Sequence, residues 1–245
     1  MISNRNASVA VVGAGDYIGA NIVRRFAREG YIVHAGRRNG EKLAPLVDEI
    51  KAAGGRCVGK TLDARKEEAI TEFLQAAEKD APLEVCIFNV GANVQFPLLE
   101  TTERVFRKVW EMACYSGFLT GREAARLMLP RKKGSIFFTG ATASIRGGKG
   151  FAAFSSAKFG LRAVAQSFAR ELGPENIHVA HLIIDSGVDT EFVRELRRKR
   201  TGRAEPEPDE LMDPKSIGET YWQLHQQTHD AWTHELDVRP YREPW

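Results

Sequence analysis

Short apolar runs rich in β-branched residues alternate along the chain with longer segments in which apolar residues recur at helical spacing. The first run, Ala7–Val12, lies between polar residues and a glycine, which is typical of a buried strand. Near the other end, Trp232–Leu236 is a candidate for a seventh strand. The runs predicted as the intervening strands are Tyr31–Ala35, Arg56–Lys60, Glu84–Phe88, Ser135–Thr139 and Ile177–Ile184.

Helical patterns separate these runs, among them Ala20–Glu29 and Pro214–Gln227. Strands that alternate with helices predict a mostly parallel sheet with helices on both faces, joined by right-handed crossovers. We therefore expect an α/β fold, a Rossmann-type doubly wound three-layer sandwich with a central parallel sheet of six to seven strands. The length of 245 residues, without a Ser/Pro-rich linker or repeat, favours a single domain over residues 1–245.

A glycine-rich turn follows the first predicted strand. Gly13, Gly15 and Gly19 lie between that strand and the helical pattern that begins at Ala20. Glycines let the backbone turn sharply and approach a pyrophosphate, while a helix N-terminus offers N–H groups and positive partial charge. Such a turn also occurs in ordinary strand–helix connections. In this alternating context it predicts a dinucleotide site.

Composition excludes several other classes of protein. With 43% hydrophobic and 27% charged residues, the chain is typical of globular proteins, and its net charge of +3 is too small to predict nucleic-acid binding. No apolar stretch reaches the roughly 18 residues of a membrane span, and the polar N-terminus lacks the core of a signal peptide, so we expect a cytoplasmic protein.

The cysteines and histidines form no recognisable motif. Cys57, Cys86 and Cys114 lie far apart, and His225 and His229, four apart on a predicted helix, have no nearby carboxylate that would complete a metal site. We therefore predict neither a disulfide nor a metal site.

The size, the strand order and the order of the motifs resemble the short-chain dehydrogenase/reductase family over nearly the whole chain. The family's cofactor turn, TGxxxGxG, aligns with residues 12–19, where Gly13 and Gly19 are kept and Tyr17 replaces the middle glycine. The resemblance implies an NAD(P)-binding domain. Together with the arginines considered next, the predicted cofactor-binding residues are Gly13, Gly15, Asp16, Tyr17, Ile18, Gly19, Arg37, Arg38, Asp63, Asn89, Gly91, Lys158 and Thr190.

Two arginines, Arg37 and Arg38, follow the second predicted strand. An NAD-specific site has an acidic residue there, which accepts a hydrogen bond from the ribose 2′-OH. Two guanidinium groups would instead attract a 2′-phosphate, so we expect NADP in preference to NAD, although exposed arginines at a strand end are the plainer interpretation. Asp16, in the glycine turn, would repel phosphate unless it points away or pairs with one of the arginines.

The family transfers hydride with four residues: a tyrosine that exchanges a proton with the substrate, a lysine four residues later, a serine that positions the substrate, and an asparagine that orders a water. On this alignment Lys158 matches the lysine, whereas Phe154, Ala141 and Cys114 occupy the tyrosine, serine and asparagine positions. Thr142 lies one residue from the serine position. The resemblance thus implies a largely substituted set of catalytic positions, with atypical or weak hydride-transfer chemistry.

Three functions therefore stay open. The first is an NADP(H)-dependent oxidoreductase in which Thr142, Ser155, Tyr115 or a water replaces the phenol. The second is a non-catalytic nucleotide-binding sensor or scaffold, and the third is another reaction on the same fold, since fold does not dictate function. We favour the first, because the cofactor supplies most of the chemistry and the loss of acid–base catalysis need not abolish hydride transfer.

The segment at about residues 190–212 corresponds to the family's lid over the nicotinamide pocket. Just before it, Asp185–Thr190 stands where the family has PGxxxT, with the threonine kept and the proline lost. A basic cluster in the lid is either a solvated helix face or a sign of an anionic small-molecule substrate. Its members are Arg194, Arg197, Arg198, Lys199, Arg200 and Arg203.

Aromatic residues near the C-terminus, Trp232, Tyr241 and Trp245, predict a contact surface. Because members of the family usually form dimers or tetramers, we expect a homodimer or a homotetramer. We expect no nucleic-acid or membrane partner.

Overall fold

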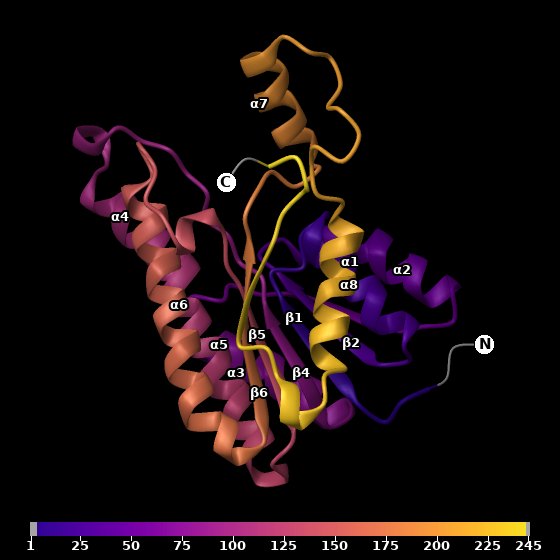
Figure 1. Cartoon of the computed structure of the whole chain (residues 1–245). Coiled ribbons are helices and arrows are strands. Elements are labelled where there is room, and N and C mark those ends of the chain that lie inside the picture. The colour runs from indigo at the N-terminus through magenta and orange to yellow at the C-terminus, as the bar shows by residue number, and fades with distance from the viewer. Residues whose placement is uncertain (1–3, 244–245) are drawn as a thin grey trace.

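Seven parallel strands form the sheet at the centre of the computed structural model, which describes residues 4–243. Their order is β3-β2-β1-β4-β5-β6-β7, and each pair of neighbours is parallel, which confirms the predicted doubly wound α/β sandwich (Figure 1). Trp245, part of the predicted aromatic surface, lies outside the described residues. The strands are β1 (Ser8–Val12), β2 (Ile32–Arg37), β3 (Arg56–Thr61), β4 (Leu83–Phe88), β5 (Gly134–Thr139), β6 (Ile177–Ile184) and β7 (Glu235–Val238).

The first six strands lie within two residues of their predicted ends, whereas the seventh lies further along the chain than predicted. The side chains before β7 have other partners. Trp232 stacks on His178 with ring centroids 4.9 Å apart, and the Thr233 N–H donates to the side chain of Gln227 at 2.8 Å. The chain therefore joins the edge of β6 only at Glu235.

Helices connect the strands and cover both faces of the sheet (Figure 1). The predicted helix over residues 214–227 ends at His225, so His229 lies beyond it in a short 3₁₀ turn, and the expectation that these two histidines share a helix is wrong. The helices are α1 (Ile18–Arg28), α2 (Ala44–Ala52), α3 (Glu67–Asp80), α4 (Glu103–Trp110), α5 (Ser116–Met128), α6 (Ala152–Leu172), α7 (Glu191–Thr201) and α8 (Pro214–His225). A π-helical turn, Glu111–Tyr115, joins α4 to α5.

Alternate residues of each central strand point to opposite faces, as the pleat requires. In β1, Val9 and Val11 belong to the apolar cluster beneath α1, α2 and α8, while Ala10 and Val12 belong to the cluster beneath α3, α5 and α6. Helix α1 also packs on α8. The ring of Phe26 in α1 makes an edge contact with that of Trp222 in α8, with 5.6 Å between the ring centroids.

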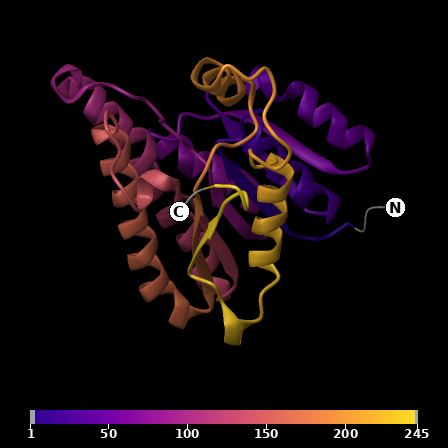
Figure 2. The ribbon, with the colours of Figure 1, turned by 45° about the horizontal axis from the view of Figure 1, so that its top comes forward.

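The carboxyl ends of all seven strands meet at one edge of the sheet, which is where ligands bind in open α/β sheets. The helix α7, which belongs to the segment predicted as a lid, stands beyond this edge in both ribbon views (Figures 1 and 2). Across residues 4–243, none of the helices has both the length and the apolar character that a membrane span requires.

Candidate functional site

A cavity of about 640 Å³ opens at the carboxyl edge of the sheet. The loops after β1, β4, β5 and β6 and the start of α6 form its walls. A second cavity of about 570 Å³ adjoins it on the side of β2 and β3, and both are lined by Gly13, Gly15, Asn89, Val90 and Gly91. The two cavities thus extend from the end of β2 to the start of α6.

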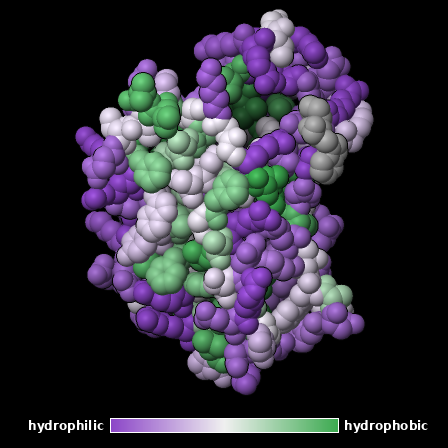
Figure 3. Space-filling model, turned by 60° about the vertical axis from the view of Figure 1, so that its left-hand side comes forward, coloured by the Kyte–Doolittle hydropathy of each residue, from purple (hydrophilic) through white to green (hydrophobic). Residues whose placement is uncertain are grey.

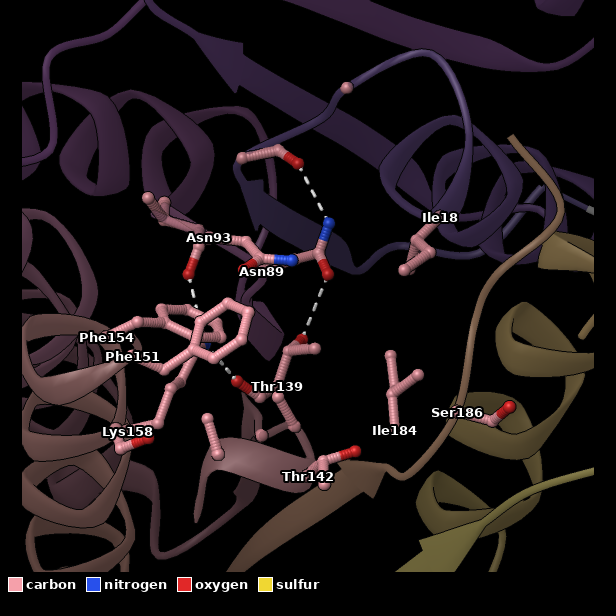
Figure 4. A pocket seen from close by; sticks show the side chains of 18 of the residues that line it. Ile18, Asn89, Asn93, Thr139, Thr142, Phe151, Phe154, Lys158, Ile184 and Ser186 are labelled. Carbon is pink, nitrogen blue, oxygen red and sulfur yellow. Dashed lines mark hydrogen bonds between the residues drawn. The ribbon is translucent and has the colours of Figure 1, made fainter. Parts of the chain in front are cut away.

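Gly13 and Asn89 hold the glycine turn against the end of β4. Gly13 has a φ of +94°, and a Cβ atom there would lie 2.6 Å from the Asn89 carbonyl oxygen, so both the conformation and the close contact require glycine. The Asn89 amide donates to the Gly13 carbonyl at 3.0 Å and accepts from Thr139 Oγ1 at 3.1 Å (Figure 4). One side chain therefore joins the ends of β1, β4 and β5.

Tyr17 extends from the glycine turn toward the lid. Its side chain lines the first cavity, and its hydroxyl accepts a hydrogen bond from the Glu191 N–H at 3.2 Å. Glu191 is the first residue of α7, and the Thr190 hydroxyl caps that helix by accepting from Val193 N–H at 3.2 Å. Tyr17 thus connects the glycine turn to α7, the start of the predicted lid.

The second cavity brings together the charged residues predicted for the adenosine end of the cofactor. Arg37 pairs with Asp16 at 2.5 Å, so the carboxylate of the glycine turn is neutralised. Arg38 lines the same cavity, is exposed, and has no ion pair among residues 4–243. Asp63 pairs with Arg65 at 2.6 Å, and this hydrogen-bonded guanidinium lowers the pKa of Asp63 to about 2.

Lys158 lies at the inner wall of the first cavity with only 3% of its surface exposed. Its Nζ donates to the Thr139 carbonyl at 2.8 Å and to the Val90 carbonyl at 3.2 Å. Burial lowers the pKa of Lys158 to about 8, against a smaller opposing effect of Cys114. The predicted lysine is therefore placed in the cavity in an environment that favours proton loss.

Phe154 stands one helical turn before Lys158, with its ring centroid 6.0 Å from Nζ. It lines the cavity, as do Ala141 and Thr142, which follow β5. Cys114 is buried in the π-helical turn and is not among the cavity-lining residues, and burial raises the pKa of its thiol to about 11. Three of the four aligned catalytic positions thus meet in one cavity.

The structure separates the candidate replacements for the phenol. Thr142 and Ser155 line the cavity, and Ser155 Oγ is buried without a hydrogen-bond partner among the described residues. Tyr115 stacks on Trp110 instead, with ring centroids 6.2 Å apart, and does not line the cavity. Tyr115 is therefore set aside as a proton donor.

Several cavity residues were not predicted from the sequence. Asn93 and Arg146 lie on loops whose course no periodic pattern fixes. Phe151, labelled with Asn93 in Figure 4, immediately precedes α6. Thr139 and Ile184 end β5 and β6, so their position at the carboxyl edge was the one available signal.

The basic cluster of the lid does not face the cavity. Arg194 pairs with Asp189 at 2.5 Å, and Arg197 pairs with Glu210. Arg198, Lys199 and Arg203 also pair with acidic residues of the lid segment. None of the cluster lines the cavity among residues 4–243, which removes the basis for expecting an anionic substrate there.

Arg146 is the arginine that does line the first cavity. It lies 3.5 Å from the buried carboxylate of Asp185, which also pairs with Arg239 at 2.8 Å. Over the described part of the chain, no group of three or more His, Cys, Asp or Glu side chains is arranged to hold a metal ion.

One family model and three known proteins show what the chain is similar to. Residues 7–201 match the family model described as short chain dehydrogenase. A crystal structure of a short-chain dehydrogenase from Rhodopseudomonas palustris has a TM-score of 0.84 and 63% sequence identity, covering 97% of this chain and 100% of that chain.

Two more distant proteins show the same likeness. An alcohol dehydrogenase from the archaeon Thermococcus sibiricus, complexed with 5-hydroxy-NADP, has a TM-score of 0.82 and 26% identity, covering 98% of this chain and 99% of that chain. The NADPH-dependent 1-acyldihydroxyacetone phosphate reductase of Saccharomyces cerevisiae is 28% identical over 195 residues. The 195 aligned residues cover 78% of this chain and 64% of the yeast protein, so the chain spans less than two thirds of that relative's length.

Proposed function

Because the chain belongs to the short-chain dehydrogenase family of NAD(P)-dependent oxidoreductases, we propose that it transfers a hydride between NADP(H) and a small carbonyl or alcohol substrate. The observation that carries this proposal is the pair of adjoining cavities, which leads from Arg38 past the glycine turn to Lys158. Its length and its mixture of charged and apolar walls suit an extended dinucleotide that ends beside a reactive centre.

The residues of the two cavities fit this cofactor. A Cβ atom built on Gly15 or Gly91 would meet nothing within 4 Å, so the backbone there faces open space that a pyrophosphate can approach. The helix α1 begins at Ile18, beside this space. The Ala20 N–H donates to the Gly15 carbonyl at 2.7 Å, while the N–H groups of Ile18 and Gly19 have no partner within the helix and are the ones a phosphate could engage. Asn89 and Thr190 would bind the nicotinamide end, which would lie beside Lys158, and Asp63 would bind the adenine.

Arg38 supports NADP over NAD. With Arg37 held by Asp16, Arg38 is the arginine of the pair left to form charge-assisted hydrogen bonds with a 2′-phosphate. The yeast relative is NADPH-dependent, and the archaeal relative was crystallised with an NADP derivative, which agrees with this choice.

When bound, the cofactor supplies the hydride, and the chain supplies position and a proton. Phe154 presents an apolar ring where the family has its tyrosine, so that position offers no phenol to exchange a proton with the substrate. Together with Ala141 at the serine position, this substitution favours weak or atypical turnover. Phe151, Phe154 and Ile184 give the substrate end an apolar wall, and residues 190–212 act as its lid.

A second copy of the chain is the partner we propose for the face formed by α4 and α6. Apolar side chains lie among hydrophilic ones on this side of the molecule (Figure 3), and Leu99, in the loop before α4, is 98% exposed. The large exposed apolar residues here are Phe96, Leu98, Leu99, Phe106, Trp110 and Phe159. Large exposed apolar patches of this kind mark protein interfaces.

The oligomeric state can be tested by light scattering of the purified protein. We expect a homodimer or a homotetramer that dissociates when Phe106 and Phe159 are both changed to glutamate. Phe192→Glu, at an exposed apolar residue of α7 outside this face, is the matched control and should leave the mass unchanged. A wild-type protein that is monomeric at micromolar concentration would exclude this partner.

Calorimetric titration with NADPH and NADH tests the proposed function. We expect measurable binding of NADPH and weaker binding of NADH, followed by slow oxidation of NADPH when 2,3-butanedione or benzaldehyde is added. If the protein binds nucleotide but reduces neither carbonyl, the nucleotide-binding sensor or scaffold is favoured. The ring of Phe154, which lacks the hydroxyl of the family's tyrosine, supports that alternative. No binding of either nucleotide would rule out both functions.

A further inference from the structure

The hydrogen bonds of Lys158 to the protein engage two of its three ammonium protons and leave the third available for transfer. A lysine ammonium has three N–H donors and no acceptor. Two of them are engaged by the carbonyls of Thr139 and Val90, at 2.8 and 3.2 Å, and both of these residues line the cavity. The neutral amine still has two N–H groups for the same carbonyls, so loss of the third proton costs no hydrogen bond to the protein.

The other proton-bearing side chains around the cavity belong to another wall, are held in an ion pair or are weak acids. The Tyr17 phenol keeps its proton but belongs to the glycine turn, where its oxygen accepts from the Glu191 N–H, and Asp16 is held in an ion pair. Thr142 and Ser155 carry aliphatic hydroxyls, which give up a proton only to a strong base. The Cys114 thiol, with its pKa raised to about 11, does not line the cavity.

The groups that face Lys158 do little to stabilise its charge, since the opposing effect of Cys114 is smaller than that of burial. Cys114, from the turn at residues 111–115, is a neutral thiol, and burial lowers the pKa of His181, from β6, to about 4, so this imidazole is uncharged at neutral pH. Asp16 and Arg146, on other walls of the cavity, are each in an ion pair. Burial therefore dominates, and a pKa of about 8 is well matched to general acid catalysis near neutrality.

We propose that the Lys158 ammonium group is itself the acid that protonates the substrate oxygen, in place of a tyrosine phenol. The proposal rests on the proposed function, because this proton accompanies the hydride. In the reductive direction the carbonyl carbon receives the hydride and the carbonyl oxygen takes one proton from Nζ. The products are an alcohol, the oxidised nicotinamide and a neutral amine, which regains its proton from solvent.

Replacing the acid while keeping its charge tests the proposal. Lys158→Arg retains a cation that can donate to both carbonyls but does not lose a proton near neutrality. We expect it to bind NADPH and to reduce 2,3-butanedione at least about 100-fold more slowly than the wild type, within the usual range for acid–base catalysis. Adding Phe154→Tyr to the same chain should restore reduction, because the phenol then supplies the proton.

The titration of Lys158 gives a readout that needs neither cofactor nor turnover, and it applies even if Lys158→Arg fails to fold. In wild-type protein labelled with ¹³C at lysine Cε, one NMR signal, absent in Lys158→Gln, should titrate with a midpoint near 8. The rate of carbonyl reduction should fall as pH rises through the same midpoint. A midpoint near the ordinary lysine value of 10.5 would overturn the proposal.

Two further outcomes distinguish a failure of the Lys158 proposal from a failure of the proposed oxidoreductase function. A Lys158→Arg enzyme that reduces carbonyls as fast as the wild type overturns the lysine acid and leaves the oxidoreductase intact. A wild type that binds NADPH yet reduces neither carbonyl, with or without Phe154→Tyr, overturns the oxidoreductase and with it the role of Lys158 as acid.

Discussion

Phe154 and Arg38 lie at the two ends of the proposed site. Phe154 presents an apolar ring beside a buried amine at the proposed substrate end, while Arg38, at the proposed adenosine end, has no ion pair among residues 4–243. The apolar ring and the guanidinium each belong to one side chain, and we expect the backbone to keep its course when either is substituted. Each can therefore be tested by a point change that leaves the fold in place.

Restoring the family's hydroxyls should increase turnover. Phe154→Tyr returns a phenol beside Lys158, and Ala141→Ser returns its partner, so the double variant should reduce simple aldehydes or diketones with NADPH at least about tenfold faster than the wild type. That gain corresponds to about 1.4 kcal/mol of barrier. Steady-state NADPH oxidation measures it. A wild type that is active and loses activity on Phe154→Tyr would show that the ring shapes a working cavity.

Removing the unpaired arginine should reduce the preference for NADPH. Charged hydrogen bonds typically contribute about 1.5–3 kcal/mol, so Arg38→Ala should weaken NADPH binding by roughly 10- to 150-fold and leave NADH binding nearly unchanged. Calorimetric titration of both nucleotides measures the two affinities. Arg37→Ala is the comparison, because it frees Asp16 to repel phosphate and should weaken both nucleotides. Equal affinities of Arg38→Ala and wild type for NADPH would contradict the assignment.

At the scale of elements, the helix and strand patterns predict the sheet well and the loops poorly. Six strands lie close to their predicted positions because buried β-branched runs have few alternatives in an α/β chain. Trp232 begins the predicted seventh strand, but its ring stacks on His178, a tertiary contact that no local pattern encodes.

The residues of the site also fall into those that a sequence pattern predicts and those that it does not. The glycine turn and the lysine of α6 follow from motifs of fixed spacing, and the structure places both in the cavity. Asn93 and Arg146 could not be predicted, because they reach the cavity from loops whose course depends on packing. The pairing of Arg37 with Asp16 was one of two alternatives for that carboxylate, and only the spatial approach of β2 to the turn distinguishes them.

The contact between the glycine turn and α7 predicts a lid whose mobility depends on one hydroxyl. Tyr17→Phe keeps the ring and removes the acceptor of the Glu191 N–H, so amide exchange over Glu191–Thr201 should become faster without a change in the core strands. Hydrogen–deuterium exchange with mass spectrometry measures this. Tyr17→Gly, which removes the ring as well, should accelerate the same peptide and weaken NADPH binding. Tighter NADPH binding would instead mean that the ring crowds the pyrophosphate.

At the scale of the whole molecule, the buried His181 and the half-buried His225 make stability depend on pH. Burial lowers the pKa of both His181 and His225 to about 4 in the folded protein, whereas the unfolded chain binds these protons near pH 6.5. Between these values the unfolded state holds more protons, so the free energy of unfolding falls as pH drops from 6.5 to 4. The full effect is about 3 kcal/mol for each histidine.

Denaturant unfolding at a series of pH values measures this slope. His225→Gln removes one titrating group and should flatten the dependence between pH 6.5 and 4. His229→Gln, an exposed histidine only four residues away, is the control and should leave the slope unchanged. A slope that is the same in His225→Gln and wild type would show that His225 does not titrate on unfolding.

The packing of α8 on α1 also sets an order for events during synthesis. Phe26 of α1 lacks its contact with Trp222 until α8 has been made, and the hydroxyl of Thr139, which bonds to Asn89, lacks its second partner until Tyr221 has been made. Because a domain generally folds as a unit, we expect this flank of the sheet to be completed only after α8 has left the ribosome. The proposed nucleotide site would then be assembled late in synthesis, although its glycine turn is made among the first residues of the chain.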